Sequence, residues 1–103
     1  MSLYDPCKSL RVTADTNAAL PAQTKVHKIV LINGTLSATA SVKLHDAATV
    51  TGNPVAEVRS NDDGGATWDE FTQSDFPEPL RFETAVSIDV TGTGVVAYIY
   101  YTL

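Results

Sequence analysis

Short segments in which apolar and polar residues alternate recur along the chain, and this alternation constrains the fold more than any other feature. Residues 38–46 show it most clearly: the apolar Ala38, Ala40, Val42 and Leu44 occupy every second position, and so share one parity. Successive side chains of a β-strand point to opposite faces of a sheet, so the pattern predicts strands with one buried face. No window shows the 3.6-residue periodicity of an amphipathic helix.

The predicted strands cover most of the chain after residue 24. In chain order they are 25–33, 38–46, 54–60, 67–73, 79–84, 85–90 and 95–101. Counting one more short strand near the N-terminus, seven or eight strands are expected, with turns about every eight to twelve residues. The sequence therefore predicts an all-β protein, a single small β-sandwich or jelly-roll-like barrel of antiparallel strands.

Two connections contain residues that tolerate positive φ, and each predicts a hairpin. Asn33-Gly34 predicts that 25–33 pairs with 38–46. Residues 91–94, which include two glycines, predict that 86–90 pairs with 95–101.

The length of 103 residues predicts one structural unit. We expect residues 1–24 to form an N-terminal arm with a first short strand, and residues 25–103 to form the β-sandwich domain. Within the arm, residues 15–24 are small and polar with a proline, which predicts a loop or an extended segment.

The charge balance argues against a nucleic-acid partner. The chain has twelve Asp and Glu and seven Lys and Arg, which gives a net charge of −5. Binding along a phosphate backbone requires positive charge instead. The nearest approach to a basic cluster is Lys25, His27 and Lys28. The N-terminus has no basic start followed by an apolar run, so no signal peptide is expected. No stretch of 18 apolar residues predicts a membrane span.

The sequence offers no support for catalysis, and we expect no catalytic, cofactor-binding or metal-binding residue. No nucleophile elbow, zinc-protease motif or phosphate-binding glycine loop occurs. The single cysteine, Cys7, excludes an intramolecular disulfide and is expected to be a small apolar filler. His27 and His45 would approach each other only if the first hairpin paired them.

The segment NDDGGATW, residues 61–68, resembles the Asp box, a hairpin motif of pattern Ser-x-Asp-x-Gly-x-Thr-Trp. The motif is matched by Asp63, Gly65, Thr67 and Trp68, and Asn61 replaces its serine. In sialidases and other propellers this box is structural, so the resemblance implies a turn rather than an active site. One copy cannot form a propeller.

The same region supplies a second hypothesis, a calcium site. Hard oxygen ligands are available from Asp62, Asp63, Asp69 and Glu70. The twelve-residue spacing of a helix-loop-helix calcium loop is absent, and adjacent aspartates in a turn more often cap backbone N–H groups or face solvent.

The last predicted strand carries apolar or aromatic residues at both parities. Val95, Ala97, Ile99 and Tyr101 share one parity, and the other holds Val96, Tyr98 and Tyr100. We expect the first set to face the core and the second to contact another layer or another subunit. Together with Leu3 and Tyr4 of the arm, Val96, Tyr98 and Tyr100 form the candidate subunit interface. The alternative is ordinary strand tyrosines, with the ring packed and the hydroxyl in water.

Two long segments carry a wider resemblance: KVHKIVLINGTLSATASVKLHDAATVTG at 25–52 and PLRFETAVSIDVTGTGVVAYIYY at 79–101. In pattern and composition they resemble small β-sandwich virion proteins of tailed bacteriophages, of the capsid decoration (cement) or head and tail accessory type. The resemblance implies a non-enzymatic virion protein, often a homotrimer, that is made in the host cytoplasm. Its expected partners are copies of itself and other virion proteins such as the major capsid protein.

The sequence is also compatible with a second function, that of a carbohydrate- or cell-surface-binding module. Many β-sandwiches bind sugars, and Trp68 with Tyr98, Tyr100 and Tyr101 supplies aromatic rings that could stack on them.

Overall fold

A computed structural model describes residues 7–33, 40–60 and 70–103, with only the backbone described for 70–73. This part of the chain is all-β, with eight antiparallel strands and no helix. The strands are β1 (Lys8–Val12), β2 (Thr16–Leu20), β3 (Lys25–Asn33), β4 (Ala40–Asp46), β5 (Ala56–Ser60), β6 (Glu70–Arg81), β7 (Val86–Thr91) and β8 (Val95–Thr102). The expected fold class is confirmed.

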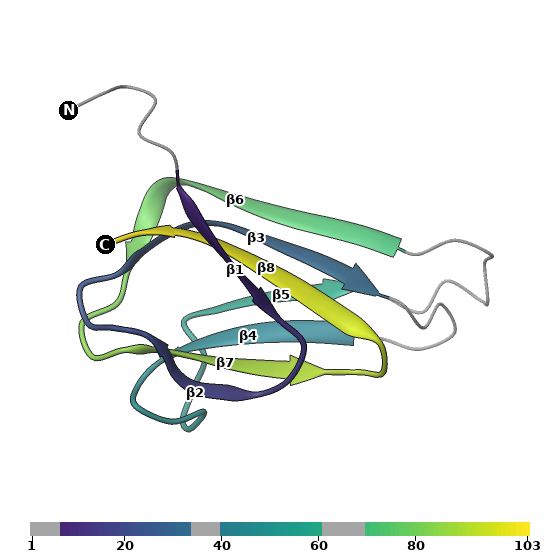
Figure 1. Cartoon of the computed structure of the whole chain (residues 1–103), viewed down its shortest axis with the longest axis horizontal. Coiled ribbons are helices and arrows are strands. Elements are labelled where there is room, and N and C mark those ends of the chain that lie inside the picture. The colour runs from purple at the N-terminus through teal and green to yellow at the C-terminus, as the bar shows by residue number, and fades with distance from the viewer. Residues whose placement is uncertain (1–6, 34–39, 61–69) are drawn as a thin grey trace.

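The strands form two four-stranded sheets that pack face to face (Figure 1). The first sheet has the order β1-β8-β3-β6 and the second the order β2-β7-β4-β5. The first half of the chain therefore pairs with the second half throughout: β1 with β8, β2 with β7, β3 with β6 and β4 with β5. One long antiparallel ribbon rolled up in this way is a jelly roll.

This topology overturns both predicted hairpins. β3 lies in the first sheet and β4 in the second, and likewise β8 lies in the first and β7 in the second. Alternation shows which side chains of a strand face inward, and a strand satisfies that pattern equally well in either sheet. The glycines after β7 instead let the chain cross between the sheets.

Two other segments differ from the sequence-based expectation. The expected loop within 15–24 contains β2, which pairs with β7 across a register irregularity. The expected strands 67–73 and 79–84 overlap one strand, β6, whose register with β3 jumps between Asp75 and Leu80. Pro77 and Pro79 lie in this irregular part, and β6 accommodates them because it is an edge strand.

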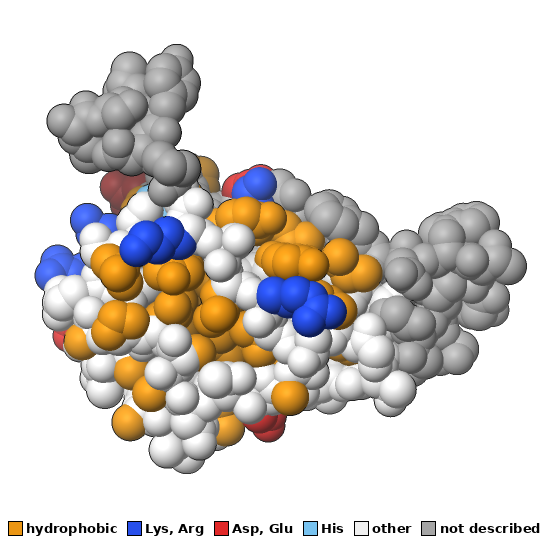
Figure 2. Space-filling model, viewed as in Figure 1, with side chains coloured by type: hydrophobic (Ala, Val, Ile, Leu, Met, Phe, Trp, Pro, Cys, Tyr) orange, Lys and Arg blue, Asp and Glu red, His pale blue; other side chains and the backbone are white. Residues whose placement is uncertain are grey.

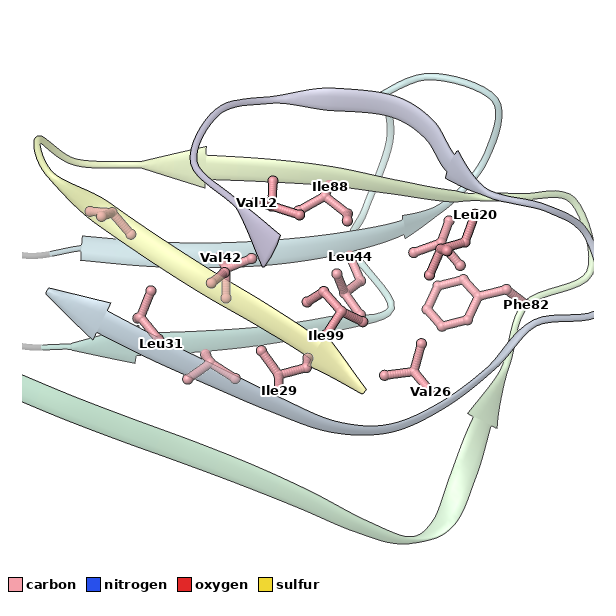
Figure 3. Close-up of a cluster of buried hydrophobic side chains, with 14 of the residues drawn as sticks. Val12, Leu20, Val26, Ile29, Leu31, Val42, Leu44, Phe82, Ile88 and Ile99 are labelled. Atoms are coloured by element: carbon pink, nitrogen blue, oxygen red, sulfur yellow. The ribbon is translucent and has the colours of Figure 1, made fainter. Parts of the chain in front are cut away.

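The core consists of inward-facing aliphatic side chains from both sheets (Figure 3). Ile29 and Leu31 of β3 and Ile99 of β8 meet Leu44 of β4 and Ile88 of β7, and all five are fully buried. Burying an aliphatic side chain of this size contributes about 2 kcal/mol, so these layers supply most of the driving force for folding.

One end of the core is closed by Phe82, which follows β6 where the chain crosses to the second sheet. Its side chain is fully buried between Leu20 and Val26 (Figure 3). Its backbone N–H donates to Thr24 O at 2.9 Å, and its carbonyl accepts from Gln23 N–H at 2.7 Å. The crossing is therefore held by both packing and backbone hydrogen bonds.

Candidate interaction surface

The outward side chains of β8 are Val96, Tyr98 and Tyr100. They are partly exposed, whereas Val95, Ala97 and Ile99 are buried. The predicted parity of this strand is therefore correct, and Tyr101 packs against the core as that parity requires.

The neighbouring strands extend this apolar surface. Tyr98 lies opposite Arg11 on β1 and Val30 on β3, and Tyr100 lies opposite Ser9 and Lys28. Val30 has the outward parity of β3 but is only 6% exposed. We name the surface formed by Val30, Ile32, Val96, Tyr98 and Tyr100 the aromatic strip.

Positive charge accompanies the aromatic strip. Lys28 Nζ lies 5.2 Å from the centroid of the Tyr100 ring, within the range of a cation–π interaction. Arg11 is exposed and lies opposite Tyr98. Figure 2 views the molecule with β1 and β8 towards the reader and shows hydrophobic side chains gathered there, with Lys and Arg among them.

The outer face of the second sheet is different in kind. At its centre Lys43 lies between Glu57 of β5 and Asp89 of β7. Arg59 pairs with Glu57 at 3.3 Å, and both side chains face solvent to a large extent. Such mixed charge is typical of a surface that stays in water. The two outer faces thus have opposite character, one apolar and aromatic, the other polar.

The two histidines do not approach each other, because β3 and β4 lie in different sheets. His27 Nε2 lies 2.8 Å from Thr102 Oγ1. His45 is 4% exposed and its Nδ1 lies 3.1 Å from Thr51 O. Since a carbonyl can only accept, Nδ1 carries the proton, and Nε2 is buried without a hydrogen-bond partner among the described residues. Within the same residues, no three His, Cys, Asp or Glu side chains are grouped to hold a metal ion.

Both carboxylate oxygens of Asp46 accept hydrogen bonds from backbone N–H groups. The donors are the N–H groups of Thr84 at 2.8 Å, Glu83 at 3.1 Å and Ala85 at 3.4 Å. The bonds from Thr84 and Glu83 lower the pKa of Asp46 because they stabilise its charged form. Its role is to hold the crossing from β6 to β7.

Several predicted residues lie outside the described part of the chain. They are Leu3 and Tyr4 of the candidate interface, the Asp-box residues Asn61, Asp63, Gly65, Thr67 and Trp68, and the calcium candidates Asp62 and Asp69. The fourth calcium candidate, Glu70, is the first residue of β6.

The expectation for Cys7 is wrong. Its side chain is exposed, immediately before β1, and it fills no part of the core. A residue next to a short edge strand has neighbours on one side only, and one sequence does not reveal that position.

Sequence reasoning did not place Arg11, Lys28 and Val30 beside the tyrosines. The sequence did contain a signal, because Lys28, Val30 and Ile32 alternate with buried residues of β3. The continuous apolar run in this strand concealed that alternation, and only the pairing of β3 and β1 with β8 brings the three residues to one surface.

No family model, no curated protein and no solved structure matches this chain. No helix long and apolar enough to span a membrane occurs in the described residues. The surfaces of the jelly roll are therefore the features from which a function can be inferred.

Proposed function

We propose that the chain is a non-enzymatic structural protein of a tailed-bacteriophage virion, of the capsid decoration (cement) or accessory type. In this role it stabilises the particle by binding other virion proteins and further copies of itself. The observation that carries the proposal is the contrast between the aromatic strip on one outer face and the charged residues on the other.

The composition of the aromatic strip supports a protein partner. Tyrosine and arginine are enriched in protein–protein interfaces, and a half-exposed tyrosine buries a large ring with little loss of side-chain entropy. Tyr98 and Tyr100 lie side by side along β8 with Arg11 adjacent. A one-sided surface of this kind suits a protein that covers a larger assembly and presents its polar face to solvent.

The jelly roll is compatible with this role but does not select it, because both viral capsid proteins and lectins use the fold. Two further features favour assembly over catalysis. The described carboxylate with a lowered pKa, Asp46, is occupied by backbone N–H groups. The described histidines lie in separate sheets.

The test is co-sedimentation of the purified protein with particles that lack it, produced from the same phage genome with this gene removed. We expect saturable binding at a fixed number of copies per particle, and a higher temperature of capsid disruption. A protein that stays in the supernatant at micromolar concentration, with particle stability unchanged, would refute the proposal.

The second candidate is a carbohydrate- or cell-surface-binding module, which the position of Tyr98 and Tyr100 favours. Their rings lie on the outer face of a sheet, where a sugar ring could stack on them. Glycan-array binding that Tyr98→Ala abolishes, without binding to particles, would select this function over the first. Tyr101, also considered for stacking, packs against the core and is a poor candidate.

A further inference from the structure

The two edges of the first sheet differ in the sign of their charge. β1 and β6 are its edge strands, and each pairs with one strand among the described residues. A strand paired on one side leaves a row of backbone N–H and C=O groups available to another strand. β1 contains Lys8 and Arg11 and no acidic residue, whereas β6 contains Glu70, Asp75 and Glu78 and ends at Arg81.

The direction of the strands allows the two edges to pair. β1 is antiparallel to β8, β8 to β3, and β3 to β6, so β1 and β6 run in opposite directions. If two copies lie side by side in the same orientation, β1 of one meets β6 of the other as an antiparallel pair. The four-stranded sheet then continues from one copy into the next.

One register matches Arg11 with Asp75. Both have the outward parity of the first sheet, as their partners Tyr98 and Lys28 show. Lys8 precedes Arg11 on β1 and Glu78 follows Asp75 on β6, so in an antiparallel pair both lie towards the same end of the contact, where β6 becomes irregular. All four side chains are exposed.

Other registers lose this match. A shift of two residues in either direction sets Arg11 opposite Gln73 or Pro77, and a shift of one residue sets outward side chains against inward ones. Leu10 and Phe76, which adjoin Arg11 and Asp75, are only partly buried against the core within one copy. The contact would therefore combine opposite charges with apolar side chains.

We infer that copies of this chain associate through these two edges, with β1 of one copy pairing with β6 of the next. The contact is heterologous, so it generates a ring or an open row rather than a two-fold dimer. The inference rests on the proposed function, because it specifies how copies join within the assembly. It leaves the aromatic strips of successive copies on one side, where many weak contacts with a particle add together.

Edge strands often carry charges and prolines that prevent association. Here Pro77 and Pro79 remove two N–H donors from β6, so the backbone contributes fewer bonds than a full ladder would. The matched charges must therefore decide whether the edges bind, which makes charge reversal an informative test.

The experiment compares two variants by analytical ultracentrifugation. One carries Lys8→Glu with Arg11→Glu, and the other carries Asp75→Lys with Glu78→Lys. We expect each variant alone to self-associate at least about tenfold more weakly than the native chain, since like charges then meet. An equimolar mixture should recover association, because each altered edge finds an opposite charge on the other variant.

Matched controls place the same charge changes on the second sheet: Lys43→Glu with Arg59→Glu, and Glu57→Lys with Asp89→Lys. These should leave self-association unchanged. Circular dichroism and thermal melting of every variant show whether it is folded. A native chain that remains monomeric up to about 1 mM overturns the inference. So does a mixture of the two edge variants that fails to associate although both are folded.

The two proposals fail in different ways. If the native chain binds particles but edge reversal leaves its self-association unchanged, the inference fails and the proposed function stands. If the edges join copies but the protein ignores particles, the proposed function fails and the edge contact stands.

Discussion

The carboxylate of Asp46 accepts a hydrogen bond from the backbone N–H of Thr84 at 2.8 Å, although the two residues are 38 positions apart. This bond and the bond from Glu83 hold the crossing from β6 to β7 against the end of β4. A backbone segment that changes sheets has no ladder partner of its own, and a side-chain acceptor from another strand supplies one.

We expect Asp46→Ala to lower the free energy of unfolding by about 1 kcal/mol, because it leaves these exposed N–H groups without their charged acceptor. Urea denaturation at pH 7 measures the loss. Glu83→Gln, an exposed change in the same crossing, is the control and should have little effect. Equal stability of the Asp46→Ala variant and the native chain would contradict this role.

The lowered pKa of Asp46 predicts a pH dependence of stability. A carboxylate whose pKa is lower in the folded chain stabilises the fold above its unfolded pKa, near the usual 3.8, and this contribution is lost as the pH falls through the folded value. The native chain should therefore lose more stability in acid than Asp46→Asn does. Unfolding curves between pH 7 and strongly acidic pH would reveal the difference, and parallel curves would rule it out.

Gly92 and Gly52 both have positive φ, at 121° and 73°, but their surroundings differ. A Cβ on Gly92 would lie 2.7 Å from Val95 Cγ2 and 3.3 Å from the backbone of Ala40, whereas a Cβ on Gly52 would meet open space. We expect Gly92→Ala to destabilise the fold by about 3 kcal/mol, and Gly52→Ala by about 1 kcal/mol from backbone strain alone. Thermal melting of both variants checks the order, and a reversed order would show that the close contacts are unimportant.

Ala18 has a φ of 47° within β2, a conformation that costs an alanine about 1 kcal/mol. Its backbone N–H donates to Ser87 Oγ at 2.9 Å, which keeps the residue in this conformation. We expect Ala18→Gly to leave stability unchanged or raise it by up to about 1 kcal/mol, and the neighbouring Ala19→Gly to lower it by about 1 kcal/mol. Similar losses for the two variants would count against strain at Ala18.

The proposed function predicts separate effects on folding and binding at the aromatic strip. Replacing Tyr98 and Tyr100 together by Ala should change the free energy of unfolding by less than about 2 kcal/mol, because both side chains are partly exposed. The same change should weaken binding to particles at least about tenfold, as loss of central interface tyrosines does. The control, Lys43→Ala with Thr91→Ala on the second sheet, should bind normally. Unchanged binding by the tyrosine variant would remove this surface from the interface.

The sequence alone determined most of the strands and their inward faces, but not β2 or the continuity of β6. The predicted segments 25–33 and 95–101 correspond to β3 and β8, and the buried parity of β8 is as expected. This succeeds because the direction of a side chain depends on its position within one strand, which is a local property. Local sequence also located the tyrosines of the aromatic strip, but not the residues beside them.

Only the tertiary structure decided which strands are neighbours. The sequences at Asn33-Gly34 and after β7 are compatible either with a hairpin within one sheet or with a crossing to the other sheet. Both connections cross, because every strand then buries its apolar face in one common core. This arrangement set Arg11, Lys28 and Val30 beside Tyr98 and Tyr100, and left a basic strand at one edge of the sheet and an acidic strand at the other. Such proximities depend on contacts between residues far apart in the chain, which a local pattern does not record.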